Sequence, residues 1–239
     1  MSKITNEYTF FEHLDELRIR LIKIAVTIVI AAFGVYGFID RLTDYIVRPV
    51  GQLVFTSPAD AFMAQITLTF LGAIVIASPI IIFQIWRFIV LGLRTQEVKF
   101  VRVFAPISLL LFLAGGLFAY FIIVPISIQF LLSFSSHNLV PMITVKSYIS
   151  FVGMMVLAFS VVFELPLILM FLTKIGIATP AFLIQKRRHA IILILIVSAL
   201  ITPPDVVSQL MLAIPLVGLY EIGIVASRIV YRNKKIGSC

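Results

Sequence analysis

The fold of this chain is decided by SYISFVGMMVLAFSVVFELPLILMFL, which runs from Ser147 to Leu172. A helix needs about 20 apolar residues to cross a bilayer, and this stretch exceeds that length with a single charge, Glu164. Lys174 should mark one membrane surface, and ten residues of helix cover ~15 Å, half of a ~30 Å hydrocarbon core. Glu164 is therefore predicted near mid-membrane.

The depth of Glu164 makes its side chain a candidate functional group. An ionised carboxylate there costs ~2.5 kcal/mol at the least, so it should face protein or a wet cavity. Pro166 cannot donate to the carbonyl of Val162, which leaves an acceptor beside the acid for water. Two interpretations stay open: a protonated Glu164 bonded to a neighbouring helix, or an intramembrane acid that works in function.

Composition indicates a polytopic membrane protein of the all-α class. Of the 239 residues, 61% are hydrophobic and 13% are charged, and the mean hydropathy is +1.14. A soluble domain holds about a quarter charged residues. The net charge of +8 would fit a nucleic-acid ligand, but in a membrane protein positive charge first reports topology. We expect one membrane domain over residues 1–239, with no nucleic-acid partner.

Motifs for catalysis, metals and cofactors are missing from the sequence. The three histidines are scattered, and no HExxH, GxSxG or P-loop pattern occurs. The one cysteine is the last residue, Cys239, so no disulfide framework is expected. We expect no enzyme activity, no metal and no cofactor.

The apolar runs predict six spans, at about residues 21–39, 63–91, 101–132, 147–173, 190–201 and 206–226. The fifth run is short for a crossing helix. Thr9 and Glu12 form a capping box that should open an amphipathic helix on the membrane surface, leading into the first span. A second short amphipathic piece is expected between Leu42 and Leu53, a kink at Pro79, and a loop over residues 174–188.

The basic residues predict which side each loop faces. Sixteen of the nineteen lysines and arginines fall at the N-terminus, in the 2–3 and 4–5 loops, and in the C-terminal tail. The opposite loops hold only Arg41, Arg48 and Lys146. By the positive-inside rule both termini should be cytoplasmic.

Acidic residues on this basic face are the second unusual feature. Glu12, Asp15, Glu16 and Glu97 lie among the sixteen cations. Local pairing would explain them, because Glu16–Arg20 at i,i+4 and Asp15–Arg18 at i,i+3 each supply a few tenths of a kcal/mol. The alternative is a carboxylate cluster that binds a basic ligand, for which the guanidinium fork of arginine is well suited.

Five motifs together resemble the TatC family, the multispanning core subunit of the twin-arginine protein translocase. They cover essentially the whole chain in this order: HLDELRIRL (His13 to Leu21), SPADAF (Ser57 to Phe62), FELPL (Phe163 to Leu167), LITPPDVVSQ (Leu200 to Gln209) and YEIGI (Tyr220 to Ile224). The resemblance implies a cupped arrangement of six helices whose last two spans are short.

The resemblance also implies a site for twin-arginine signal peptides on the cytoplasmic face. Glu16 and Glu97 match acids that contribute to this site, and Arg18, Phe88 and Leu93 match positions linked to the same surface. Glu97 matches by position more than by motif, because Val98 and Lys99 follow it where the family often carries further basic residues.

Two further roles are implied by the same resemblance. Glu164 matches an intramembrane acid near the partner subunits and the transport path. A polar patch at the outer end of spans five and six matches a docking place for single-span partners, and its residues are Thr202, Pro203, Asp205 and Gln209. For Thr202 and Gln209, ordinary hydrogen bonding at helix ends is the structural alternative.

The sequence thus predicts the receptor and scaffold of a translocase for folded proteins. It should lie in the plasma membrane of a prokaryote, bind twin-arginine signal peptides, recruit TatA-like and TatB-like single-span proteins, self-associate, and use the protonmotive force. The alternative is a secondary transporter or proton channel built around Glu164. No internal repeat or second mid-span charge supports that alternative.

Overall fold

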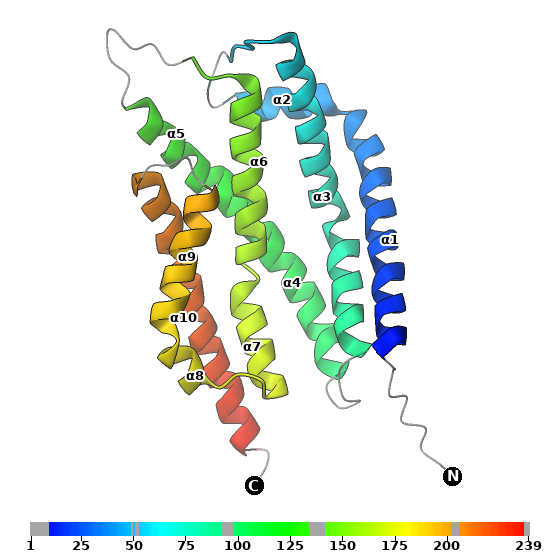
Figure 1. Cartoon of the computed structure of the whole chain (residues 1–239), viewed down its shortest axis with the longest axis vertical. Coiled ribbons are helices and arrows are strands. Elements are labelled where there is room, and N and C mark those ends of the chain that lie inside the picture. The colour runs from blue at the N-terminus through cyan, green and yellow to red at the C-terminus, as the bar shows by residue number, and fades with distance from the viewer. Residues whose placement is uncertain are drawn as a thin grey trace. The chain divides into compact units, whose positions relative to one another are not determined.

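The computed structural model describes residues 10–48, 50, 53–91, 98–133, 142–201 and 206–236, and nearly all of them are helical (Figure 1). The only strand-like pairing in these ranges is an isolated bridge between Val54 and Thr144. The helices are α1 (Phe10–Tyr36), α2 (Ile39–Val47), α3 (Pro58–Leu91), α4 (Val98–Phe118), the π-helix η1 (Ala119–Ile123), α5 (Val124–Leu132), α6 (Val145–Val162), α7 (Leu165–Ile175), α8 (Pro180–Gln185), α9 (Arg187–Ile201) and α10 (Val206–Ile236).

Five helical segments of the described chain are long and apolar enough to cross a membrane. They are His13–Tyr36, Pro58–Leu91, Val101–Leu132, Val145–Ile175 and Gln209–Arg232. The all-α, multi-pass prediction is confirmed. The predicted fifth span corresponds to α9, whose 15 residues reach only ~22 Å.

The fourth span is interrupted at Glu164, where α6 ends and α7 begins. The amide of Glu164 donates to the carbonyl of Val161 at 3.1 Å, three residues back rather than four. Pro166 then occupies the first turn of α7, where its missing N–H costs nothing. The disturbance expected from Pro166 is present, as a break between two helices.

Several local expectations differ from the structure. The N-terminal segment forms no separate helix in the described residues, because α1 continues unbroken from Phe10 to Tyr36. Pro79 lies inside α3, which continues to Leu91, and the kink expected at this residue stays a prediction. The loop expected over residues 174–188 contains α8, which begins after Thr179: the Thr179 hydroxyl accepts from the amide of Phe182 at 3.2 Å, and Pro180 is the first helical residue. That Thr-Pro start signal was visible in the sequence and was missed.

The described chain divides into two compact units. The first consists of residues 1–39 and 69–109, which hold α1, most of α3 and the start of α4. In it α1 runs beside α3 (Figure 1), and Trp86 of α3 stacks on Phe104 of α4 with ring centroids 5.7 Å apart. The second unit consists of residues 40–68 and 110–239.

The second unit is held by close helix packing. A Cβ added to Gly115 of α4 would lie 2.5 Å from the carbonyl oxygen of Phe159 in α6, and one added to Gly223 of α10 would lie 2.7 Å from Leu169 in α7. Both glycines therefore allow backbones to approach, as small residues do between membrane helices. Phe159 itself is fully buried.

Polar side chains in the second unit bond from helix to helix. The hydroxyls of Thr173 (α7) and Ser227 (α10) are buried and 2.6 Å apart. The Tyr220 hydroxyl donates to the carbonyl of Leu183 in α8 at 2.8 Å. These bonds satisfy buried polar groups and fix α10 against its neighbours.

Candidate functional site

The candidate site begins with one face of α1. His13, Glu16 and Arg20 recur at spacings of three and four residues, which places them on the same side of a helix. That side meets α3: the His13 ring lies 4.6 Å from the ring of Phe88, and Arg20 Nη1 donates to Gln84 Oε1 at 3.4 Å. Phe88 and Gln84 are themselves one turn apart.

Arg20 is the most buried member of this cluster. Its relative exposure is 5%, and its Nη2 lies 2.5 Å from Glu16 Oε1. Its Nε–H is also buried and has no hydrogen-bond partner in the part of the chain that the structure describes. The buried guanidinium and its carboxylate attract each other strongly, because little water is present to compete.

Glu16 is held by this arginine and still reaches the surface. Its side chain is 32% exposed, whereas that of Arg20 is 6% exposed. One oxygen, Oε1, is occupied by Arg20, and a carboxylate has about four lone-pair sites. Glu16 can therefore accept hydrogen bonds from a second, incoming cation without releasing the first.

The structure separates Glu16 from the neighbouring charges that the sequence grouped with it. Asp15 and Arg18 are both exposed, and no ion pair joins them in the described residues. Arg18 lies two residues from Glu16, about 200° around the helix, so the two side chains leave opposite sides of α1. The Glu16–Arg20 pairing is confirmed, and the Asp15–Arg18 pairing is wrong.

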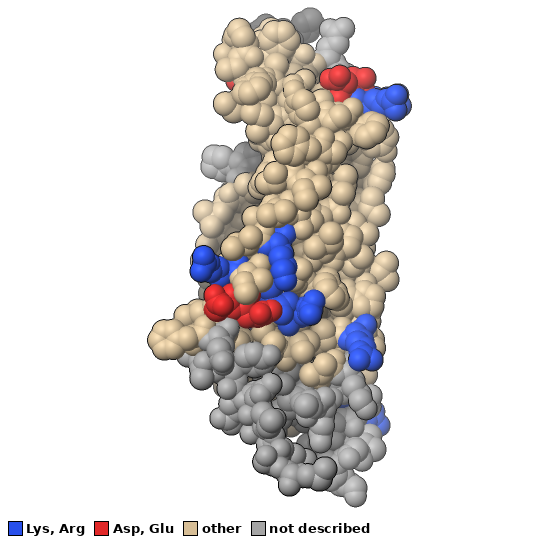
Figure 2. Space-filling view, turned by 90° about the vertical axis from the view of Figure 1, so that its right-hand side faces the viewer, with Lys and Arg blue, Asp and Glu red and all other residues tan. Residues whose placement is uncertain are grey.

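Acidic and basic side chains lie side by side in the lower half of the face drawn in Figure 2, and a second group with both signs lies near its upper end. On α1, Asp15, Arg18 and Lys23 are exposed. Sequence reasoning missed His13, Arg20 and Gln84 as parts of the site. Arg20 and His13 share a helical face with Glu16, which was a usable signal, whereas nothing in the sequence pointed to Gln84, 64 residues from Arg20.

Several predicted site residues lie outside the described residues. They are Leu93, Glu97, Thr202, Pro203 and Asp205. Gln209, the remaining member of the predicted docking patch, donates from Nε2 to the carbonyl of Leu195 at 3.0 Å. This bond ties α10 to the middle of α9.

Glu164 belongs to the second unit, whereas the α1 cluster belongs to the first. It is the N-cap residue of α7 and its side chain is half-buried. Its own carbonyl accepts from the amide of Ile168 at 2.9 Å, so the helix restarts directly at this residue. Among the described residues no group of three or more metal-ligating side chains occurs.

Comparison with known proteins shows the family. Residues 12–215 match the family described as Sec-independent protein translocase protein (TatC). The chain belongs to the TatC family. The Sec-independent protein translocase protein TatC of Desulforapulum autotrophicum is 38% identical over 241 residues, which cover 98% of this chain and 89% of that protein. The TatC protein of Helicobacter pylori strain J99 is 40% identical over 219 residues, which cover 91% of this chain and 88% of that protein.

Solved structures agree with this assignment. A crystal structure of the twin-arginine translocase receptor TatC superposes with a TM-score of 0.84 at 36% identity, covering 92% of this chain and 99% of that one. A crystal structure of the twin-arginine translocase receptor TatC in dodecyl maltoside superposes with a TM-score of 0.83. The chain is thus a multi-pass membrane component of a protein translocase.

Proposed function

We propose that this TatC-family chain is the signal-peptide receptor of a twin-arginine translocase, and that Glu16 binds an arginine of the peptide. The observation that carries the proposal is the partly exposed carboxylate of Glu16. Among the described residues, only one of its two oxygens is occupied, by the buried guanidinium of Arg20. A preoriented carboxylate loses little side-chain entropy when a ligand binds. Its free lone pairs suit a guanidinium, which donates two parallel hydrogen bonds.

A second acid completes the binding site for the two arginines in this proposal. Glu97, which lies between α3 and α4 in the sequence, would take the second arginine, with Phe88 and Leu93 supplying apolar contact. Arg18, on the other side of α1, would flank the site instead of contacting Glu16. The basic surroundings repel a diarginine peptide at long range, so capture depends on these local carboxylates.

Signal-peptide binding by Glu16→Gln tests the proposal. Glutamine keeps an oxygen that accepts from Arg20, so the fold is retained while the charge is lost. A charge-assisted hydrogen bond contributes ~1.5–3 kcal/mol, so affinity for a twin-arginine peptide should fall ~10-fold or more. Asp15→Asn is the matched control, since it removes an exposed charge one residue away and should leave affinity nearly unchanged.

Equal weakening by Glu16→Gln and Asp15→Asn would contradict the proposal. It would mean that the peptide senses only the summed surface charge. A twin-lysine peptide that binds as tightly as the twin-arginine peptide would contradict the bidentate contact.

The membrane arrangement proposed for the chain has six crossings and cytoplasmic termini. The basic asymmetry of the loops supports it, with α9 as a short fifth span and α10 as the sixth. In a Cys239→Ser background, cysteines at Gly51 and Ser136 should react with an impermeant thiol reagent from outside. Cysteines at Gln96 and Gln185 should not, and the reverse pattern would contradict the topology.

Transport would then depend on partners and on the protonmotive force, without catalysis on this chain. TatA-like and TatB-like single-span proteins would dock beside the outer ends of α9 and α10, at Thr202, Pro203, Asp205 and Gln209. Self-association of the chain in the complex is part of the same proposal.

Glu164 would contact partner helices or passing substrate in this proposal. Export of a folded reporter, normalised to protein level, should be mostly retained in Glu164→Gln and reduced in Glu164→Leu, with Glu164→Ala between them. Equal export by the Leu variant and the unmodified chain would make Glu164 a purely structural residue.

A further inference from the structure

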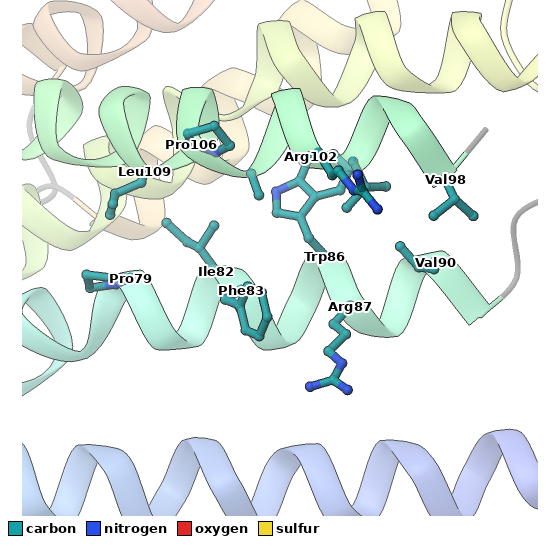
Figure 3. Close-up of a pocket in the computed structure, with 12 residues that line it drawn as sticks. Pro79, Ile82, Phe83, Trp86, Arg87, Val90, Val98, Arg102, Pro106 and Leu109 are labelled. Atoms are coloured by element: carbon teal, nitrogen blue, oxygen red, sulfur yellow. The ribbon is translucent and has the colours of Figure 1, made fainter. Parts of the chain in front are cut away.

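A pocket lies between α3 and α4, wholly inside the first unit. Its volume is about 520 Å³, and ten of its twelve lining residues are apolar or proline. The other two are arginines, Arg87 on α3 and Arg102 on α4. Figure 3 shows Trp86 pointing from α3 towards α4 across this pocket, with Arg102 beside its ring.

The pocket is polar at one end only. Arg87 lies four residues before the end of α3, and Arg102 lies four residues after the start of α4. Since a helix rises 1.5 Å per residue, both cations lie ~6 Å from their helix ends, at the same level. From there the apolar wall continues to Pro79 and Leu109, ~12 Å and ~11 Å further along the two helices.

Among the described residues, no carboxylate neutralises the positive charge at this end. Both arginines are exposed, and neither forms an ion pair with a carboxylate in the part of the chain that is described. No acidic residue is among the described residues that line the pocket. The Arg87 guanidinium lies 5.9 Å from the ring centroid of Phe83 and extends away from α4, whereas Arg102 extends beside the pocket (Figure 3).

We propose that this pocket binds one acyl chain of an anionic glycerophospholipid whose phosphate contacts Arg102, with Arg87 adding charge at the same level. Helices that cross a membrane are surrounded by lipid, and basic pockets between them recruit anionic headgroups. Arginine binds phosphate with two parallel hydrogen bonds. A phosphatidylcholine headgroup carries its own cation, which the two arginines oppose.

The same charges disfavour a twin-arginine peptide in this pocket. Its basic segment would meet the two guanidiniums of Arg87 and Arg102, and like charges at close range cost free energy. The pocket shares no lining residue with the Glu16 cluster, and its occupation by lipid does not depend on the signal-peptide function proposed for that cluster.

Trp86 supplies the measurement, because it is the one tryptophan of the chain and is 5% exposed in the pocket wall. The full chain is reconstituted in phosphatidylcholine vesicles that contain increasing fractions of a phospholipid with brominated acyl chains, which quench tryptophan on contact. Brominated phosphatidylglycerol should quench half-maximally at a several-fold lower mole fraction than brominated phosphatidylcholine.

Variants assign this preference to the pocket. Arg102→Gln should remove most of the phosphatidylglycerol preference and Arg87→Gln a smaller part. Arg188→Gln, an exposed cation on α9, should keep the full preference. Ala105→Phe, which fills the pocket without changing its charge, should reduce saturable quenching by phosphatidylglycerol.

Three results would overturn the proposal. The first is equal quenching by the two lipids in the unmodified chain. The second is an unchanged phosphatidylglycerol preference in the Arg87→Gln/Arg102→Gln double variant. The third is displacement of brominated phosphatidylglycerol by an equimolar twin-arginine peptide, which would assign the pocket to the peptide.

Discussion

The two units of this molecule use polar side chains in opposite ways. In the second unit, Thr173 and Ser227 are buried and satisfy one another at 2.6 Å. In the first unit, Arg20 is also buried, but its Nε–H has no hydrogen-bond partner among the described residues, and its partner Glu16 reaches the surface. Completed polar pairs hold helices together, whereas an incomplete pair at a surface retains the capacity to bind a ligand.

Helix α1 of the first unit is less buried than helix α10 of the second unit. In the membrane-crossing window of α1, 11% of the residues are buried, against 44% in α10. Within the first unit α1 is joined to α3 by His13–Phe88 and Arg20–Gln84. Helix α10 has the small-residue contact at Gly223 and the Thr173–Ser227 bond. The first unit should therefore respond to changes of charge and the second to changes of volume.

The largest effect on stability is expected from Glu16→Ala. This change leaves the Arg20 guanidinium buried without a carboxylate, and breaking a buried ion pair costs several kcal/mol. The free energy of unfolding in detergent should fall by ~3 kcal/mol. The loss should be less than half as large in Glu16→Gln, whose side-chain oxygen still accepts from Arg20. Equal losses in the two variants would show that Arg20 does not need an acceptor at this position.

The next largest effect is expected from Gly115→Ala in the second unit. The added methyl would lie 2.5 Å from the Phe159 carbonyl oxygen, so the backbones of α4 and α6 must separate. Overpacking of this kind costs ~1–3 kcal/mol. The matched control is Gly218→Ala in α10, where nothing lies within 4 Å of the added Cβ. Thermal unfolding should separate the two variants, and equal melting temperatures would contradict close packing at Gly115.

The smallest effect is expected from the two halves of the hydroxyl pair. The Thr173 hydroxyl also donates to the Leu169 carbonyl at 2.9 Å, so Ser227 must act as donor to Thr173. Thr173→Val therefore removes the acceptor of a buried donor and should cost ~1 kcal/mol or more. Ser227→Ala should cost less, because the Thr173 hydrogen keeps its bond to Leu169. The reverse order in urea or thermal unfolding would contradict this assignment of the proton.

Much of the fold was predictable because it depends on local chemistry. Apolar runs longer than the bilayer is thick predict spans, and Pro166 predicts the disturbance found at Glu164. The start of α8 at Thr179–Pro180 was equally local and was missed because the surrounding segment is short. The number of membrane crossings is harder to predict from the sequence than the presence of helices, since α9 has only 15 residues.

The candidate site was only partly predictable because its chemistry is not local. The i,i+4 spacing predicts the Glu16–Arg20 pair. From spacing alone, its contribution to stability would be that of a surface pair, a few tenths of a kcal/mol. The burial of Arg20 against Gln84, which is 64 residues away in the sequence, changes the expected contribution of the pair to stability. Spacing likewise paired Arg18 with Asp15, although the structure leaves both side chains exposed.

The most direct measurement of the central claim is a double-mutant cycle between the receptor and its ligand. Glu16→Gln is combined with replacement of each signal-peptide arginine by glutamine, and the four dissociation constants of each cycle are compared. One of the two arginines should couple to Glu16 by ~1.5–3 kcal/mol, and neither should couple to Asp15 in the parallel cycle with Asp15→Asn. Coupling near zero for both arginines would contradict the claim that the Glu16 carboxylate, held by Arg20, binds the peptide.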